Sequence, residues 1–133
     1  MYRIIIAGSR DFTDYNLLKL NVGAFIFENC KLFQIEIVSG CAEGADRLGE
    51  KYAKEYNLPV KHFPANWNRY GKSAGYLRNG DMAQYADALI AFWDGESLDI
   101  NSMIWVEFPD SLITALKNVN GVLYIFSSHT GGS

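Results

Sequence analysis

Five short apolar runs, separated by longer segments with helical spacing, most constrain what this chain can fold into. The first run, residues 3–7 (Arg-Ile-Ile-Ile-Ala), is rich in β-branched side chains and stops at Gly8. A continuous run of this kind is typical of a strand that is buried on both faces of a parallel sheet. Runs of similar character occur at residues 34–38, 60–63, 88–93 and 122–126.

The segments between these runs have the apolar spacing of amphipathic helices. Four helices are expected: one capped by Asp14, one across residues 45–56, one across residues 72–86, and one from Asn101 or Ser102 that Pro109 interrupts. Strands that alternate with helices imply right-handed crossovers and a parallel sheet. The predicted fold is therefore α/β, a three-layer Rossmann-like domain with a parallel sheet of about five strands flanked by helices.

Length and composition fit one domain, expected over residues 1–126, with a disordered tail at residues 127–133. No segment has the pattern of a secretory leader or of a membrane span. Cys30 and Cys41 are expected to be free thiols in the cytoplasm, and no Cys/His spacing predicts a metal. No cofactor is expected. The net charge of −3 disfavours a general polyanion binder, yet eleven of the twelve Lys and Arg fall in residues 1–78, so a local positive pocket is compatible with it.

The loops that follow the strands contain the candidate binding residues, because the carboxyl ends of parallel strands meet at one edge of the sheet. Gly8, Ser9 and Arg10 follow the first run and offer a close backbone approach, a hydroxyl and a guanidinium, all suited to phosphate. The same three residues fit a tight turn with a solvated arginine equally well.

The segment from Ser39 to Asp46 is a stronger signal for phosphate. Gly40 and Gly44 bracket a loop of small residues that opens onto a helix, where unpaired N–H groups gather. The Gly-x-Gly-x-x-Gly spacing of dinucleotide sites is absent. Asp46 could bind a ribose hydroxyl, although an acid in a first helical turn is more often explained by the helix dipole. Arg47 is expected at the surface.

Residues 70–73 (Tyr-Gly-Lys-Ser) resemble a P-loop only superficially, because Asn66 stands where that loop needs glycine. Lys72 is expected at the start of the third helix, and Arg78 is expected to be partly buried on it, next to Asn79. The anionic partner of Arg78 is expected to be a ligand phosphate or one of Asp81, Asp87 and Asp94. Trp67 and Tyr70 could stack on a base or form a lid over the core.

Acidic residues near the end of the fourth run are the candidates for acid/base chemistry, although an Asp-Gly pair is more often a solvated turn. Neither His62 nor His129 has a serine or cysteine partner at a motif spacing, so nucleophilic catalysis is not indicated. The predicted ligand-binding set is Gly8, Ser9, Arg10, Ser39, Gly40, Gly44, Ala45, Asp46, Lys72, Arg78, Asn79, Asp94 and Gly95. The candidates for catalysis are Arg78 and Glu96.

Together these motifs resemble the short single-domain branch of the SLOG superfamily, which also includes the lonely-guy phosphoribohydrolases and the DNA-processing protein A family. The similarity extends from residue 3 to about residue 104. Its motifs lie at residues 8–12, 38–46, 63–67, 70–75, 78–82 and 86–95. The resemblance implies that the strand-end loops bind nucleotides or nucleotide-derived ligands, with Arg78 as the conspicuous cation.

The resemblance also implies what catalysis would need. The lonely-guy enzymes cleave the N-glycosidic bond of nucleoside monophosphates with an arginine and a glutamate, and that glutamate lies in a Gly-Gly-x-Gly-Thr-x-x-Glu segment. Here Asp99-Ile100 replaces Gly-Thr, and Met103 stands at the glutamate position. A methionine cannot transfer a proton.

The sequence therefore favours a domain that binds a nucleotide-like small molecule, as a sensor or binding domain with little or no catalysis. One alternative is a nucleotide N-glycosidase in which Glu96 or Asp94 replaces the missing acid. Another is an oligomeric interaction module with a vestigial pocket, in which Trp105 and Phe108 form the contact between copies. Nucleic acid is disfavoured as a partner, because the basic residues do not form a run interleaved with aromatic residues.

Overall fold

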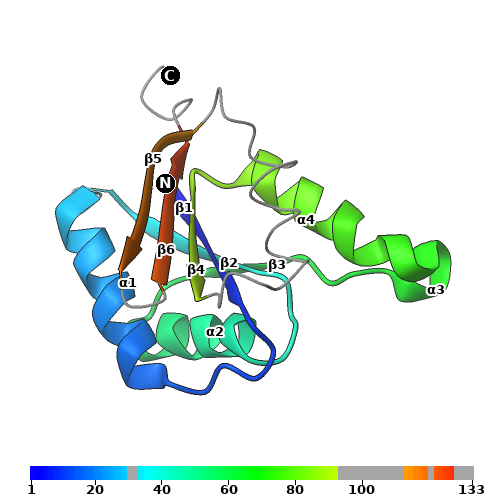
Figure 1. The fold of residues 1–133 in the computed structure, drawn as a ribbon, viewed down its shortest axis with the longest axis horizontal. Coiled ribbons are helices and arrows are strands. Elements are labelled where there is room, and N and C mark those ends of the chain that lie inside the picture. The colour runs from blue at the N-terminus through cyan, green and yellow to red at the C-terminus, as the bar shows by residue number, and fades with distance from the viewer. Residues whose placement is uncertain (30–32, 93–112, 120–121, 128–133) are drawn as a thin grey trace.

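The computed structural model describes residues 1–29, 33–92, 113–119 and 122–127, with side chains described up to residue 92 (Figure 1). The elements in chain order are β1 (Tyr2–Gly8), α1 (Tyr15–Asn29), β2 (Ile35–Ser39), α2 (Ala45–Glu55), β3 (Val60–His62), α3 (Trp67–Tyr70), the 3-10 turn η1 (Gly71–Ser73), α4 (Ala74–Tyr85), β4 (Ala88–Phe92), β5 (Ile113–Val119) and β6 (Val122–Ser127).

One six-stranded sheet organises the fold, in the order β3-β2-β1-β4-β6-β5. The strands β1 to β4 are parallel, which confirms the predicted α/β, Rossmann-like class. The prediction of about five parallel strands was wrong in detail. The run at residues 122–126 forms β6, which pairs antiparallel with β4, and β5 was not expected. Two residues separate β5 from β6, and a connection that short permits only an antiparallel pair.

Alternate residues of β1 pack on opposite faces of the sheet, as the continuous run predicted. Ile4 and Ile6 join a buried cluster with residues of α1 and α2, including Leu18 and Tyr52. Ile5 and Ala7 join a second cluster with residues of α4, including Met82 and Ala83. Helices therefore cover both faces, and the strand ends are left to form a site (Figure 1).

The predicted helices are largely confirmed. Asp14 caps α1, since its Oδ1 accepts a hydrogen bond from Leu17 N at 3.0 Å. The stripe at residues 45–56 forms α2, and the third helix is regular from Ala74 after the short turn η1. The fourth helix, with Pro109, lies outside the described residues. Ser127 belongs to β6 although it was expected in the disordered tail, and the rest of that tail is also outside them.

None of the helices in the described part of the chain has the length and apolar character needed to cross a bilayer.

Candidate functional site

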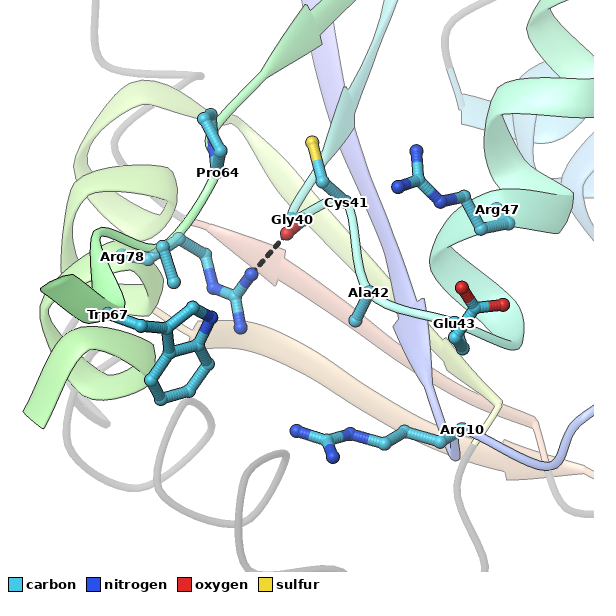
Figure 2. Close-up of a pocket in the computed structure, with 10 residues that line it drawn as sticks. Arg10, Gly40, Cys41, Ala42, Glu43, Arg47, Pro64, Trp67 and Arg78 are labelled. Atoms are coloured by element: carbon cyan, nitrogen blue, oxygen red, sulfur yellow. Dashed lines mark hydrogen bonds between the residues drawn. The ribbon is translucent and has the colours of Figure 1, made fainter. Parts of the chain in front are cut away.

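A pocket of about 400 Å³ lies at the carboxyl ends of the first parallel strands. Its lining comes from the loop after β1, the loop between β2 and α2, the first turn of α2, the segment after β3, and the helices α3 and α4 (Figure 2). The lining residues are Arg10, Gly40, Cys41, Ala42, Glu43, Arg47, Pro64, Ala65, Trp67 and Arg78. The fold thus brings three of the predicted binding residues, Arg10, Gly40 and Arg78, to one hollow.

Gly8 and Gly44, two of the predicted binding residues, lie where backbone segments pass too closely to leave room for a side chain. Gly44 has a φ of 80°, and a Cβ there would lie 2.3 Å from Ser9 O. A Cβ on Gly8 would lie 2.3 Å from Phe92 O. The neighbouring amides join the same segments, since Ala45 N donates to Ser9 O at 3.3 Å and Ser9 N to Phe92 O at 3.1 Å. Gly8, Ser9, Gly44 and Ala45 therefore hold the loops of β1 and β2 together beneath the pocket.

Gly40 lies between the side chains of Arg78 and Asp46, two of the predicted binding residues. Arg78 Nη1 donates to Gly40 O, and Arg78 Nε donates to Oδ1 of the buried Asn79 at 2.9 Å. A Cβ on Gly40 would lie 2.6 Å from Arg78 Nη1 and 2.8 Å from Asp46 Oδ2. The absence of a side chain at residue 40 thus lets the guanidinium reach the loop (Figure 2).

Asp46 points into the loop between β2 and α2. It is 6% exposed, and its Oδ2 accepts a hydrogen bond from Ala42 N at 3.2 Å. Burial raises the pKa of Asp46 to about 6, while the Ala42 amide and the charge of Arg78 act in the opposite direction. This carboxylate supports the loop in addition to lying at the favourable end of the helix dipole. Its predicted contact with a ribose stays a prediction.

The hydroxyl of Ser39, which was predicted to bind a ligand, forms its hydrogen bonds within the protein. Ser39 is 1% exposed, its Oγ donates to Glu50 Oε2 at 2.5 Å, and the same Oγ accepts from Cys41 N at 3.1 Å. Cys41 lines the pocket as a free thiol with a φ of 66°, and burial raises the pKa of this thiol. The other predicted free thiol, Cys30, lies outside the described residues.

The prediction that Arg47 lies at the surface is confirmed, since half of its side chain is exposed, and this exposed side chain also lines the pocket. Its Nη1 donates to the two carboxylate oxygens of Glu50 at 3.0 and 3.3 Å. The position directly after the glycine loop was the available signal, because the first turn of α2 faces the same space as the loop. Trp67 is 52% exposed at the pocket, while Tyr70 is not among the described lining residues.

Two of the three carboxylates proposed as partners of Arg78, Asp81 and Asp87, lie elsewhere. Asp87 Oδ2 accepts from Arg3 N at 2.9 Å at the amino-terminal edge of the sheet, and Asp81 is exposed on α4. Among the described residues, no carboxylate forms an ion pair with Arg78. Lys72 is exposed in η1 and is not in the described lining.

The remaining candidates, Asp94, Gly95, Glu96 and the substituted position Met103, lie outside the described residues, as do Trp105 and Phe108. Within the described part of the chain, no group of His, Cys, Asp or Glu side chains is arranged to hold a metal.

Comparison with known proteins assigns the chain to a family. The model of the YspA, cpYpsA-related SLOG family matches residues 2–70. The chain belongs to this SLOG family, as its motifs predicted. The match covers the segments that carry Arg10, Gly40 and Arg47 and ends before α4, which carries Arg78. The chain is also similar to the Gene 61 protein of Mycobacterium phage D29, with 30% identity over 104 residues, 74% of this chain and 82% of the phage protein. No solved structure matches the chain.

Proposed function

We propose that this SLOG protein binds a nucleotide or nucleotide-derived small ligand in the pocket of Figure 2, as a sensor or binding domain with little or no catalysis. The observation that carries the proposal is the set of three guanidinium groups, Arg10, Arg47 and Arg78, on one pocket at the carboxyl ends of parallel strands. Ligands of open α/β sheets bind at this edge, and the guanidinium fork matches phosphate oxygens.

Arg78 gives the proposal its charge argument. Its described partners are a backbone carbonyl and a side-chain amide, both of them neutral. A partly buried guanidinium is usually balanced by an anion, because desolvating an uncompensated charge is costly. The charge of the buried Asp46 acts on Arg78, but no described carboxylate forms an ion pair with it, and a phosphate in the pocket would supply one.

Trp67 supports a nucleoside rather than a simple anion. Its ring lines the pocket beside the Arg78 guanidinium, and about half of the residue's surface is exposed (Figure 2). An exposed indole beside a cationic pocket offers a face on which a base can stack, and such stacking is worth about 1–3 kcal/mol per base. Phosphate contacts at the arginines and a base at Trp67 together describe a nucleotide.

The small number of acidic side chains in the described lining of the pocket is the reason to propose little or no catalysis. Glu43 is the only carboxylate among the described lining residues, and methionine stands at the family glutamate position. A phosphoribohydrolase remains the alternative, with Glu96 or Asp94 as the acid. Binding without release of a free base separates the two functions.

A proton NMR time course with AMP, GMP, CMP, UMP, ADP-ribose and NAD tests the proposal. We expect saturation transfer from the protein to at least one of these ligands and no free base at later times. Arg78→Ala should strongly reduce the transfer, whereas Arg69→Ala, which removes an exposed arginine of α3 outside the described lining, should preserve it. Release of a free base would establish the hydrolase instead, and the absence of transfer to every ligand would contradict nucleotide binding.

A further inference from the structure

We infer that Arg47 forms a second anion-binding subsite in this pocket, so that the ligand, if the proposed function holds, is a nucleoside diphosphate rather than a monophosphate. Arg47 and Arg78 both line the pocket but have different partners. Arg78 is bound to Gly40 and Asn79, and Arg47 is bound to Glu50.

Hydrogen bonds behind the pocket hold Arg47 in place. Glu50 accepts from Arg47 Nη1 with both oxygens, and its Oε2 also accepts from Ser39 Oγ at 2.5 Å. Ser39 is buried at the end of β2, so this pair is anchored to the sheet. Glu50 Oε1 is also 4.0 Å from His62 Nε2. These contacts use Nη1 of Arg47, and half of the Arg47 side chain is exposed, so its guanidinium keeps donors for a ligand.

The loop after β2 separates this guanidinium from that of Arg78. Figure 2 shows the segment from Gly40 to Ala42 running between Arg78 and Arg47, with the Arg10 side chain extending toward the side of Trp67. Because a backbone segment lies between the two guanidinium groups, we do not expect one phosphate to contact both, whereas two linked anionic groups can contact one guanidinium each. A ligand with its base at Trp67 would place one phosphate by Arg78 and Arg10 and a second by Arg47.

The charges on the lining agree with a ligand that has two anionic groups. Three arginines against one glutamate, Glu43, leave two positive charges in excess among the described lining residues. A monophosphate can carry two negative charges but places both on one group, whereas a diphosphate offers two separate anionic groups for arginines at different positions. Glu50 offsets part of the charge of Arg47, so we expect the second phosphate to add less affinity than the first.

Titration calorimetry with the pairs AMP and ADP, GMP and GDP, CMP and CDP, and UMP and UDP tests this inference. For the base that binds, the diphosphate should bind about tenfold more tightly than the monophosphate, the lower end of what a hydrogen bond to a charged group contributes. Arg47→Ala should remove that advantage, because it should weaken binding of the diphosphate by a larger factor than binding of the monophosphate. Lys54→Ala, which removes an exposed cation at the far end of α2, should leave both affinities unchanged.

The outcomes separate this inference from the proposed function. Equal affinity for a monophosphate and its diphosphate, or an equal loss of both in Arg47→Ala, would overturn the second subsite while nucleotide binding stands. Failure of every ligand to bind the wild-type protein would overturn both. Loss of the diphosphate advantage in Lys54→Ala as well would show a general effect of charge and would also overturn the assignment to Arg47.

Discussion

The two edges of the parallel sheet each hold a half-buried arginine, but the surroundings of the two guanidinium groups differ. At the amino-terminal edge, Arg3 Nε lies 3.4 Å from Glu36 Oε1, and Arg3 Cζ lies 4.6 Å from the centroid of the Tyr85 ring. At the carboxyl edge, the described partners of Arg78 are a carbonyl and an amide. The chain itself balances the charge of Arg3. Arg78 lies at a pocket and forms no ion pair with a described carboxylate, although the charge of the buried Asp46 acts on it, and we expect the two arginines to have different roles.

The contacts that hold the chain together also differ between the two edges. At the amino-terminal edge, side chains join the elements, as when Tyr85 at the end of α4 donates to Glu36 of β2. At the carboxyl edge, backbone segments pass so closely that neither Gly8, against Phe92 of β4, nor Gly44, against Ser9 and Arg10, has room for a Cβ. Because backbone contacts join the segments at the carboxyl edge, substitution of Gly8 or Gly44 should lower the stability of the fold.

The largest expected effect on stability is that of Gly44→Ala. A residue with a side chain is strained at a φ of 80°, and the new Cβ would lie 2.3 Å from Ser9 O and 2.5 Å from Arg10 O. Strain and crowding together should lower the free energy of unfolding by about 3 kcal/mol or more. Denaturant unfolding monitored by circular dichroism measures this loss.

Gly71→Ala is the matched control for that substitution. Gly71 also has a positive φ, 56°, but nothing lies within 4 Å of its Cβ position. Only the backbone strain applies, so the loss should be about 1–2 kcal/mol. Equal losses at the two glycines would show that the crossing of the loops does not contribute to stability.

The next largest expected effect is a pH dependence of stability that Asp46, at the carboxyl edge, causes. Burial raises the pKa of Asp46 from its ordinary 3.8 to about 6, so the folded protein binds more protons than the unfolded protein between these values. The contribution of Asp46 to stability therefore falls as pH rises from 4 to 6, by about 2–3 kcal/mol at most, and is constant above this window.

Asp46→Asn tests this dependence, because an amide oxygen can still accept from Ala42 N but does not ionise in this range. Relative to Asp46→Asn, the wild-type protein should lose stability between pH 4 and pH 7 in denaturant titrations. A difference between the two proteins that is independent of pH would contradict the raised pKa of Asp46.

The smallest effect is expected at the amino-terminal edge. Arg3→Ala removes an ion pair and a contact with an aromatic face, both partly exposed, and should lower the free energy of unfolding by about 1 kcal/mol. The affinity for nucleotides should be unchanged, because Arg3 lies at the opposite end of the strands from the pocket. A loss of affinity in Arg3→Ala would break the distinction between the edges.

Local patterns were enough to predict most of the fold. The β-branched run of β1, the Asp14 cap of α1 and the small-residue stripe of α2 each act through neighbours in the chain, so sequence spacing reveals them. The hairpin of β5 and β6 was missed because the segment at residues 113–119 mixes polar and apolar residues without clear alternation. The dipeptide Asn120-Gly121 was a usable signal, since it is typical of two-residue hairpin connections.

The candidate site was predicted less completely, because its contacts join segments far apart in the chain. The pocket position of Arg10, Gly40 and Arg78 follows from the parallel topology, which sequence reasoning had inferred. The spacing of Gly44 does not show that it touches the loop of Ser9, nor does that of Ser39 show that its hydroxyl faces Glu50. The direction of a long side chain such as Arg47 likewise depends on how α2 packs on the sheet.

The central claim is that Arg78 is kept for a ligand, whereas Arg3 is balanced by the chain. Titration of Arg78→Ala with the nucleotide that binds the wild-type protein, together with its denaturant unfolding, tests that claim most directly. We predict that affinity falls by about ten- to a hundredfold, the range expected for loss of hydrogen bonds to a charged group, while the free energy of unfolding changes little. Unchanged affinity with a large loss of stability would contradict the claim, because Arg78 would then be structural.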